Sequence, residues 1–245
     1  MVMNLSNRIK DPIFKIVSAA GNQLGVDTYV VGGYVRDLLL KRSSKDLDFV
    51  CVGSGVALAE AVHEYLGGKR PINVFKNFGT AMINNGDQEL EFVGARKESY
   101  NRQSRKPIVE DGSLEDDQNR RDFTINALAI SLNEENYGEL IDPFDGVLDI
   151  ERKLLRTPLN PDKTFDDDPL RMMRAVRFAA QLQFKIDSRA LLSIREHADR
   201  IKIVAPERVS QELNKIMAVE RPSYGLGLLF TTGLLQHILP EIQDL

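Results

Sequence analysis

A segment that reads as strand, glycine turn, short helix and strand constrains the fold of this chain more than any other feature. It has the sequence Val-Val-Gly-Gly-Tyr-Val-Arg-Asp-Leu-Leu-Leu at residues 30–40 and Lys-Asp-Leu-Asp-Phe-Val at residues 45–50. Successive side chains of a strand point to opposite faces, so the pattern places Asp46 and Asp48 on the same face. Two neighbouring carboxylates repel each other unless a cation lies between them, and Mg²⁺ is a hard divalent ion that prefers oxygen ligands. The segment therefore predicts a divalent metal site on a strand.

The glycine pair ahead of the aspartates adds a second requirement. Gly32 and Gly33 stand where the predicted helix begins, and glycines there let backbone N–H groups come close to a phosphate. Arg36 and Asp37 follow within the helix. An Asp-x-Asp pair alone is more often the solvated face of a strand than a metal site, but the ordered combination favours metal and phosphate binding. The reaction that this combination indicates is nucleotidyl transfer.

The composition is that of an ordinary globular chain and limits other functions. With 245 residues, 42% hydrophobic and 28% charged, the chain has room for one large domain or two small ones. No apolar run approaches the ~20 residues of a membrane helix, and residues 1–10 lack a signal core, so we expect a cytoplasmic protein. The single cysteine, Cys51, excludes an internal disulfide, and His63, His197 and His237 fit no metal-binding spacing. The formal net charge of −4 decides little, because local patches govern nucleic-acid binding.

The first 148 residues mix strand and helix signals. Asn85-Gly86 between two alternating runs is a strong hairpin signal. Residues 95–112 are polar, begin with basic residues and lack any period, so we expect a mobile loop there. The other predicted elements are strands at 27–31, 46–52, 80–84, 89–93, 127–132 and 139–141, and helices at 34–41 and 55–66.

From about residue 149 the apolar residues recur at helical spacing. The pattern predicts helices at 169–182, 188–198, 206–219 and 224–235. The fold class is therefore α+β, with a mixed domain at residues 1–148 and an all-helical domain at residues 149–245. The last residues remain rich in apolar side chains, so we expect that a further C-terminal part is absent from this chain.

A second constellation lies at residues 120–129, Arg-Arg-Asp-Phe-Thr-Ile-Asn-Ala-Leu-Ala. Arginine binds phosphate through its fork of donors, so Arg120 and Arg121 beside Asp122 and Asn126 could hold a triphosphate. These residues alone fit a surface ion-pair cluster equally well.

The third constellation is a helix that begins after Asp168. Asp168, Arg171, Arg174 and Arg177 are three residues apart and form one ridge of this helix. Arginines at this spacing are also common on solvated faces, and Asp-Pro is a common helix start, so the spacing leaves both readings open. A neighbouring apolar ridge should face the core, and it consists of Leu170, Met173, Val176 and Ala180.

Taken in this order, these segments resemble the class II tRNA nucleotidyltransferases, the CCA-adding enzymes of the polymerase-β-like superfamily, and the related bacterial poly(A) polymerases. The resemblance extends from about residue 30 to residue 217 and implies a nucleotidyltransferase head followed by a helical neck. The matching motifs are those for metal and phosphate (32–37 and 46–48), ribose and triphosphate (120–127), the hinge (142–146), nucleotide selection (167–171 with Arg174 and Arg177) and the last neck motif (207–209).

The resemblance implies a template-independent enzyme that adds CCA to the tRNA 3′ end from CTP and ATP. Asp46 and Asp48 would hold two Mg²⁺ ions. Glu91 is the candidate third carboxylate, and Glu89, on the same face, is its competitor. The residues expected to bind the nucleotide are Gly32, Gly33, Arg36, Arg121, Asp122, Asn126, Asp168, Arg171, Arg174 and Arg177.

The resemblance also implies that Asp168 and Arg171 choose the base. Cytosine and adenine both present an amino donor beside an unprotonated ring nitrogen, which a carboxylate and a guanidinium can pair with. Guanine and uracil present the reverse pattern, at a cost of ~1–3 kcal/mol for each unsatisfied group. A bond from the Asp168 side chain to a backbone N–H two or three residues on would count against this role. Asp167 stands where the family usually has Glu.

Three rivals share these motifs or the fold. Bacterial poly(A) polymerases typically carry a basic-aromatic signature that residues 69–75 lack, and CC-adding enzymes usually lack a flexible loop for which residues 96–112 are long enough. A non-catalytic RNA-binding module of the same fold would have lost a metal aspartate. We therefore expect full CCA addition, with A-adding, CC-adding and poly(A) activities as alternatives. We also expect weak tRNA binding if a C-terminal part is absent. The sequence leaves the oligomeric state open.

Overall fold

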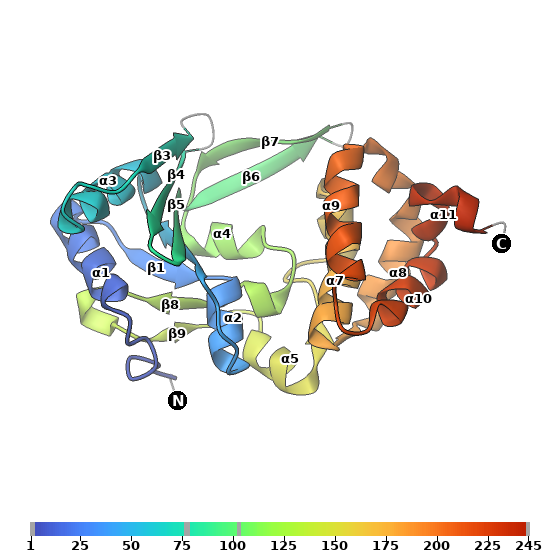
Figure 1. Ribbon diagram of the computed structural model, residues 1–245, viewed down its shortest axis with the longest axis horizontal. Coiled ribbons are helices and arrows are strands. Elements are labelled where there is room, and N and C mark those ends of the chain that lie inside the picture. The colour runs from blue at the N-terminus through green and yellow to red at the C-terminus, as the bar shows by residue number, and fades with distance from the viewer. Residues whose placement is uncertain (1–2, 76–78, 102–103, 244–245) are drawn as a thin grey trace. The chain divides into compact units, whose positions relative to one another are not determined.

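The computed structural model describes residues 3–75, 79–101 and 104–243, and its ribbon is drawn in Figure 1. The chain divides into two compact units, here called the head unit and the helical unit. The head unit consists of Met1–Glu98, Val109–Arg121 and Ile125–Val147, and the helical unit consists of Ser99–Ile108, Asp122–Thr124 and Leu148–Leu245.

The head unit is built on a seven-stranded mixed sheet with the order β3-β4-β5-β2-β1-β8-β9. The central pair β2 and β5 is parallel, whereas the other neighbouring pairs are antiparallel. The strands are β1 (Thr28–Val31), β2 (Asp46–Cys51), β3 (Ile72–Phe75), β4 (Thr80–Asn85), β5 (Gln88–Gly94), β8 (Ala129–Ser131) and β9 (Leu140–Ile141).

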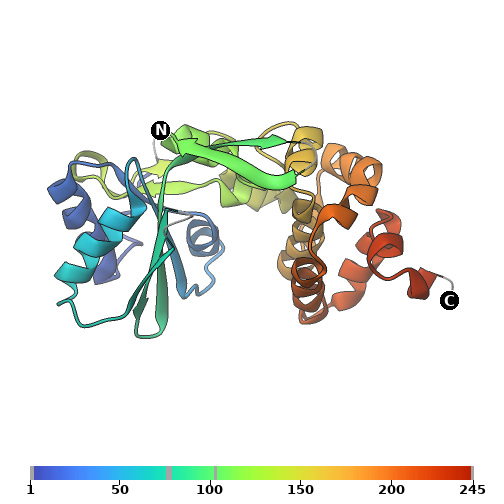
Figure 2. The ribbon, with the colours of Figure 1, turned by 90° about the horizontal axis from the view of Figure 1, so that it is seen from above.

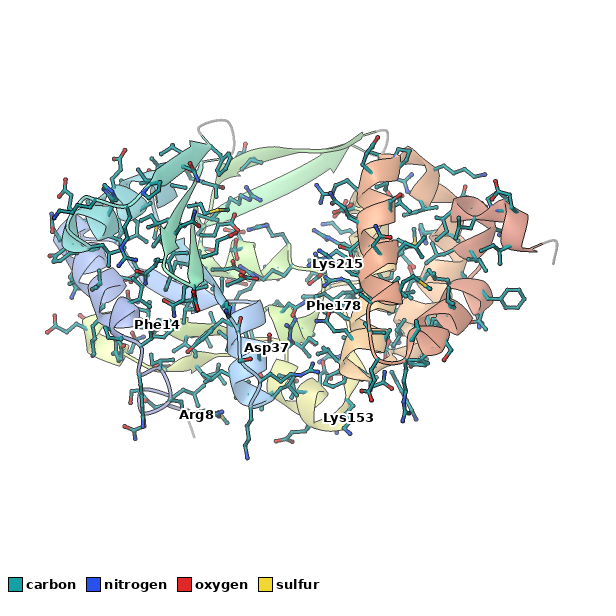
Figure 3. The ribbon with its side chains drawn as sticks, viewed as in Figure 1. Arg8, Phe14, Asp37, Lys153, Phe178 and Lys215 are labelled. Atoms are coloured by element: carbon teal, nitrogen blue, oxygen red, sulfur yellow. The ribbon has the colours of Figure 1, made fainter. Side chains whose placement is uncertain are left out.

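One face of this sheet is covered by helices α1 (Pro12–Leu24) and α3 (Gly55–Tyr65), which also contact each other (Figure 2). The Phe14 ring, labelled in Figure 3, lies edge-on to Phe49 at a centroid distance of 6.1 Å, and Phe49 stacks on Phe92 at 5.1 Å. All three side chains are fully buried. This face therefore supplies the main hydrophobic core of the head unit.

The opposite face of the sheet changes character along its strands. At one end it carries a small buried cluster that includes Tyr29, Val31 and Val50. Two and four residues before Val50 the same face carries Asp48 and Asp46, because side chains alternate along β2. The sheet thus presents carboxylates at the end of β2 where the apolar cluster stops.

Three short helices, α2, α4 and α5, each begin at a turn or capping residue that can be identified. Helix α2 (Gly33–Leu39) starts after Gly32, and α4 (Leu114–Asn119) starts with a capping box in which Ser113 and Asp116 each accept from the other's backbone N–H. Helix α5 (Gly146–Arg152) begins where the Asp142 carboxylate accepts from the N–H groups of Gly146 and Val147, at 2.7 and 2.9 Å. The segment expected to be a hinge motif is therefore a capped helix start.

The prediction of a mobile loop at residues 95–112 is wrong, because most of this segment forms two strands. The structure pairs β6 (Arg96–Asn101) with β7 (Ser104–Asp111) in a separate two-stranded sheet, and residues 102–103 lie outside the described residues. Most positions of these strands are polar, and their apolar residues Pro107, Ile108 and Val109 are consecutive, so no alternation marks an apolar face. Backbone pairing needs no such face, and the periodicity argument fails here for that reason.

The helical unit packs α7 (Leu170–Leu182) against α9 (Pro206–Met217) and α10 (Pro222–Thr231), and α6 (Pro161–Asp167) against α8 (Ser188–His197). The remaining elements are η4 (Ala198–Ile203), α11 (Leu235–Ile238), α12 (Pro240–Gln243) and the parallel pair β10 (Leu154–Leu155) and β11 (Lys185–Ile186). Among the described residues, no helix has the length and apolar character needed to cross a bilayer.

Most predicted elements are confirmed, with shifts at their ends. The predicted apolar ridge of α7 is buried as expected. The predicted helix at 224–235 is split, because α10 ends at Thr231 and Gly233 adopts a φ of 77° before α11 begins. Among the described residues, the helices α1, α4, α5, α6 and α12 form without a sequence prediction.

Candidate functional site

The register of the two central strands gathers four carboxylates on one face of the head-unit sheet. Asp46 lies opposite Glu89, and Asp48 lies opposite Glu91, across the parallel β2–β5 pair. Asp46 and Glu89 are exposed, whereas Asp48 and Glu91 are half-buried. We call these four residues the acidic row.

Without a bound cation, burial and mutual repulsion disfavour the ionised forms of the carboxylates in the acidic row. Burial raises the pKa of Asp48, and the charges of Asp46 and Glu89 raise it further, while Arg121 lowers it. Burial likewise raises the pKa of Glu91, and Asp48 and Glu89 add to that effect. A bound cation would offset both effects, since it favours the ionised carboxylates.

The turn that precedes α2 lies close to Asp48 of the acidic row. Gly32 has a φ of 74°, a value that favours glycine. A Cβ atom at Gly32 would lie 2.9 Å from Nη1 of Arg121 and 3.5 Å from Oδ2 of Asp48. The backbone of Gly32 therefore approaches both charged groups closely, and any larger residue would push the guanidinium away.

Arg36 is buried within the head unit rather than extended toward solvent. Its Nε and Nη2 donate to the two oxygens of Asp37, each at 2.9 Å, and its Nη1 donates to Oδ1 of Asn126 at 2.8 Å. These bonds join α2 to the segment at residues 120–129. The described contacts of Arg36 therefore fix α2 against Asn126.

Arg121 is anchored by Asp117, a residue that the sequence reasoning missed. The Asp117 carboxylate is fully buried and pairs with Arg120 and with Arg121, whose Nη2 lies 2.8 Å from Oδ2. Nη1 of Arg121 also donates to the Asn126 carbonyl at 3.2 Å. Burial by itself would raise the pKa of Asp117, but the two arginines outweigh it and hold the pKa below its usual value. The spacings i,i+3 and i,i+4 on a helix were the available sequence signal.

In the helical unit, Arg174 of α7 pairs with Asp122. Nε and Nη2 of Arg174 lie 2.7 and 2.6 Å from Oδ2 of Asp122, while Oδ1 of Asp122 accepts from the Phe123 N–H at 2.8 Å. Asp122 is buried. Two motifs that are distant in the sequence therefore meet through one ion pair.

The same unit holds a second buried acceptor, Asp149. Its Oδ2 accepts from Thr124 Oγ1 at 2.6 Å and from Arg156 Nε at 3.1 Å. The Thr124 N–H donates to the Arg156 carbonyl at 2.8 Å. This network ties residues 122–124 to the start of the helical unit.

The predicted base-selecting pair has local partners. Oδ1 of Asp168 accepts from the Leu170 N–H at 3.1 Å, so the side chain caps the start of α7. This is the bond that the sequence analysis named as counting against a base-reading role. Arg171 is buried, with Nη1 3.5 Å from the Thr164 carbonyl.

Arg177 is also held by its neighbours. Its Nε lies 2.6 Å from Oε2 of Glu212 on α9, and its guanidinium lies 4.0 Å from the centroid of the Phe178 ring, which is labelled in Figure 3. The ridge of arginines on α7 is therefore not a simple solvated face, because Arg171, Arg174 and Arg177 each have an acceptor. Glu212 was not identified from the sequence.

The expected site residues are divided between the two units. The helical unit contains Asp122, Asp168, Arg171, Arg174 and Arg177. The head unit contains the metal-binding candidates and the other nucleotide-binding candidates, which are Asp46, Asp48, Glu91, Gly32, Gly33, Arg36, Arg121 and Asn126.

Among the described residues, one group of three side chains brings its metal-ligating atoms within 4.8 Å of one another, and it consists of Asp162, Glu196 and His197. Asp162 and Glu196 are exposed, and the sequence analysis had treated His197 as a residue without a metal role. The acidic row does not form such a group, so its side chains would have to move toward a shared ion.

Two family models match this chain. The model described as the poly A polymerase head domain matches residues 28–156, and the model described as a probable RNA and SrmB-binding site of polymerase A matches residues 183–245. The first match covers more than half of the chain.

Curated relatives match most of this chain in sequence, but they are longer proteins. An A-adding tRNA nucleotidyltransferase of Aquifex aeolicus is 41% identical over 203 residues, which are 82% of this chain and 24% of that protein. A CCA-adding enzyme of Levilactobacillus brevis is 38% identical over 224 residues, which are 91% of this chain and 54% of that enzyme. The chain thus spans about half the length of the CCA-adding relative and about a quarter of the A-adding one.

Solved structures share the fold. A tRNA nucleotidyltransferase complexed with a primer tRNA and an incoming ATP analog superposes with a TM-score of 0.79 at 35% identity, covering 91% of this chain and 62% of that one. A CCA-adding enzyme in complex with ATP superposes with a TM-score of 0.85 at 28% identity, covering 98% and 57%. The fold is that of the polymerase-β-like nucleotidyltransferases, and the chain belongs to the poly A polymerase head-domain family.

Proposed function

We propose that this chain is a template-independent RNA nucleotidyltransferase that completes the CCA end of tRNA from CTP and ATP. The observation that carries the proposal is the acidic row, in which Asp48 lies beside the Gly32 turn and Arg121. Metal-binding carboxylates, a close backbone turn and a guanidinium at one strand end are the parts that transfer of a nucleotide requires. A relative named CCA-adding enzyme and a similar structure that holds a primer tRNA and an ATP analog support this substrate.

The donor set of the acidic row fits Mg²⁺. Asp46 and Asp48 would hold the metal, with Glu91 as the third carboxylate and Glu89 as the alternative. The half-buried position of Glu91 opposite Asp48, and its raised pKa, support Glu91 over the exposed Glu89. When bound, Mg²⁺ supplies activation of the RNA 3′-hydroxyl and neutralisation of the triphosphate.

The residues around the acidic row have two kinds of role in this proposal. Gly32 and Gly33 would bring backbone N–H groups to the triphosphate, and Arg121 would donate to its oxygens. Arg36 and Asn126 would act on the nucleotide mainly by fixing α2 against the Arg121 segment, since their bond joins these two elements. These groups are preorganised by the contacts described above.

The helical unit contains the residues that would select the base. We keep Arg171 and Asp168 as the base-selecting pair, together with Asp122, Arg174 and Arg177 as nucleotide-binding residues. Reading a base through Oδ1 of Asp168 would require its bond to the Leu170 N–H to break, and losing a capping bond costs ~1 kcal/mol.

A-addition alone is the second candidate, and the observation that favours it is the 41% identity to an A-adding enzyme. Two substrates separate the candidates, a tRNA that ends before CCA and a tRNA that ends in CC. Each is offered CTP, ATP or both, with Mg²⁺, and the products are resolved on a sequencing gel. Two C residues and one A on the shorter tRNA would support CCA addition. One A, added only to the CC-ended tRNA, would instead identify an A-adding enzyme, and a long A tail a poly(A) polymerase.

The variant Asp46→Ala is the control for a genuine nucleotidyltransferase activity. It should remove turnover while far-UV circular dichroism remains unchanged, because Asp46 is exposed. Unchanged turnover would contradict the metal role of the acidic row. A tRNA substrate would also fit the cytoplasmic location expected from the sequence.

A further inference from the structure

The buried carboxylate of Asp117 is shared by two consecutive arginines, one for each of its oxygens. Oδ2 lies 2.9 Å from Nε and 2.8 Å from Nη2 of Arg121, and Oδ1 accepts from Nε of Arg120 at 3.0 Å. The Asp117 side chain is fully buried. Burial by itself would raise its pKa, but Arg121 and Arg120 hold that pKa below the usual value. The carboxylate is therefore ionised at neutral pH and binds both guanidinium groups.

The helix that carries Asp117 is attached to the head-unit sheet. The Asp117 N–H donates to the Ser113 carbonyl at 3.1 Å, within the capped first turn of α4. The next residue, Gln118, is buried, and its Nε2 donates to the Ala127 carbonyl at 2.7 Å and to the Ile141 carbonyl at 3.4 Å. Ala127 leads into β8, and Ile141 belongs to β9. These bonds fix the position of the Asp117 carboxylate relative to the sheet that carries the acidic row.

The contact with Asp117 sets the direction of the Arg121 guanidinium. Nε and Nη2 form one edge of this planar group, and both lie against Oδ2 of Asp117. The third nitrogen, Nη1, donates to the Asn126 carbonyl at 3.2 Å and would lie 2.9 Å from a Cβ atom at Gly32. The same Cβ would lie 3.5 Å from Oδ2 of Asp48. Asp117 therefore directs Nη1 toward the turn and the carboxylate beside which a triphosphate would bind.

An arginine held in this way differs from an arginine on an open surface. A long side chain that is free loses rotamer freedom when it binds a ligand, whereas a guanidinium already in place loses little. The charges of Asp117, Arg120 and Arg121 together leave one net positive charge, which favours an anion beside them. The carboxylate thus contributes orientation, and Arg121 contributes the donor that the triphosphate would meet.

We propose that Asp117 is a positioning residue for nucleotidyl transfer, which acts by holding Nη1 of Arg121 where it meets the triphosphate. This inference rests on the proposed function, in which Arg121 donates to the triphosphate. Asp117 itself touches neither the nucleotide nor the metal, because both of its oxygens are taken by the two arginines. Loss of the carboxylate should therefore act on catalysis only while Arg121 is present.

A double-mutant cycle on Asp117→Asn and Arg121→Gln tests this dependence. The asparagine amide keeps one acceptor and places an N–H₂ donor against a guanidinium group, so the orientation of the arginines is lost. The reaction is transfer from ATP to the CC-ended tRNA with Mg²⁺, which the CCA-adding and A-adding candidates share. We expect kcat/KM for ATP to fall about 100-fold in Arg121→Gln and about 30-fold in Asp117→Asn. The double variant should lie within about threefold of Arg121→Gln alone.

The cycle separates positioning from a merely structural role. A loss of folded enzyme would lower the rate by the same factor with or without Arg121, so the two effects would multiply in the double variant. Isothermal titration with ATP gives a second readout that needs no turnover, and the ATP affinities should show the same pattern as the rates. Far-UV circular dichroism at the assay temperature checks that each variant is folded.

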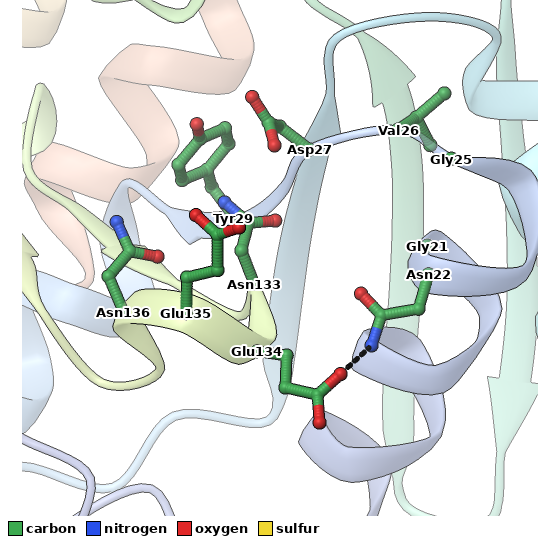
Figure 4. A pocket seen from close by; sticks show the side chains of 10 residues that line it. All are labelled: Gly21, Asn22, Gly25, Val26, Asp27, Tyr29, Asn133, Glu134, Glu135 and Asn136. Atoms are coloured by element: carbon green, nitrogen blue, oxygen red, sulfur yellow. Dashed lines mark hydrogen bonds between the residues drawn. The ribbon is translucent and has the colours of Figure 1, made fainter.

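Two control variants remove a carboxylate elsewhere in the head unit. Glu115→Gln changes an exposed position of α4 itself. Glu135→Gln changes an exposed residue of the pocket drawn in Figure 4, which lies at the start of β1, whereas Gly32 follows the end of that strand. Both variants should keep the rate and the ATP affinity of the unmodified chain within about twofold.

Two outcomes would overturn the positioning role while the proposed function stands. One is a kcat/KM of Asp117→Asn within about threefold of that of the unmodified chain, and the other is a double variant in which the two losses multiply. An unmodified chain that neither binds ATP nor transfers its nucleotide would overturn the proposed function as well.

If Asp117→Asn does not fold, Arg121→Lys provides the decisive measurement. Lysine keeps the positive charge, but its single ammonium group, once paired with Asp117, leaves no second nitrogen to direct at the triphosphate. We expect a kcat/KM below about a tenth of that of the unmodified chain. A higher value would reject the need for the orientation that Asp117 imposes.

Discussion

Arg174 and Asp122 are joined by two contacts to one carboxylate oxygen, at 2.7 Å from Nε and 2.6 Å from Nη2. The other oxygen of Asp122 accepts from the Phe123 N–H. This pair connects the segment at residues 122–124 to α7 within the helical unit. Both residues were predicted to bind the nucleotide, yet the structure shows that each is also needed by the other.

We predict that Asp122→Asn lowers the free energy of unfolding by ~1–3 kcal/mol. The change removes the negative partner of a pair whose carboxylate is buried, which leaves Arg174 with a weaker acceptor. Urea unfolding followed by circular dichroism measures the effect. The exposed residue Glu220 offers a control, and Glu220→Gln should stay within ~0.5 kcal/mol of the unmodified chain. Equal stabilities of the two variants would contradict the role of the pair.

The stabilisation by Asp117 should depend on pH. Its pKa is held below the usual value by Arg121 and Arg120, so the unfolded chain binds a proton at a higher pH than the folded chain does. The stabilisation is then fully present above the ordinary carboxyl pKa of ~3.9 and is lost as pH falls through the lower, folded-state pKa. We expect Asp117→Asn to cost ~3 kcal/mol at pH 7, and we expect this difference to shrink below pH ~4.

Urea unfolding of both proteins at several pH values between 3 and 7 checks this prediction. The matched control is Glu115→Gln, on an exposed position of the same helix α4. A difference between Asp117→Asn and the unmodified chain that stays constant over the whole pH range would show that the two arginines do not set the stability of this carboxylate.

Gly32→Ala should destabilise the head unit by ~2 kcal/mol. Its φ of 74° is strained for any residue with a Cβ, and the added atom would come within 2.9 Å of the Arg121 guanidinium. Gly227 on α10 has no atom within 4 Å of an added Cβ, so Gly227→Ala should be neutral or stabilise by up to ~1 kcal/mol. Thermal unfolding of the two variants gives the comparison, and a harmless Gly32→Ala would refute the close approach of backbone and guanidinium.

Removal of metal should reverse the effect of Asp48→Asn on stability. Because the folded-state pKa of Asp48 is raised, the metal-free chain loses stability as pH rises from the ordinary carboxyl pKa through the folded-state value. In EDTA at pH 7.5 the neutral Asn should therefore raise the melting temperature by ~2–4 °C. With Mg²⁺ the unmodified chain should gain stability by mass action, whereas the variant should gain little.

Differential scanning fluorimetry with and without Mg²⁺ measures both effects. Asp87→Asn changes an exposed carboxylate that forms a salt bridge with Lys45. This control variant should respond to Mg²⁺ like the unmodified chain. A Mg²⁺ response in Asp48→Asn as large as that of the control would be incompatible with metal binding at the acidic row.

Local patterns determined much of this protein. Alternation in β2 placed Asp46 and Asp48 on one face, Asn85-Gly86 marked the β4–β5 hairpin, and helical spacing identified α7 to α10. Each of these signals arises between residues that are close in sequence, where side-chain period and turn chemistry act directly. The paired strands β6 and β7 were not predicted, because their residues show no such period.

The tertiary structure decided which of the predicted groups meet. The β2–β5 register sets Glu91 opposite Asp48 and Glu89 opposite Asp46. The sequence places both glutamates on the same face of β5, but it does not tell which of them lies opposite Asp48. Long-range contacts likewise buried Arg36 against Asn126 and joined Arg174 to Asp122. The sequence by itself determined the elements and the face on which the carboxylates lie. Only folding decided their partners, because strand register and buried ion pairs depend on residues that are far apart in the chain.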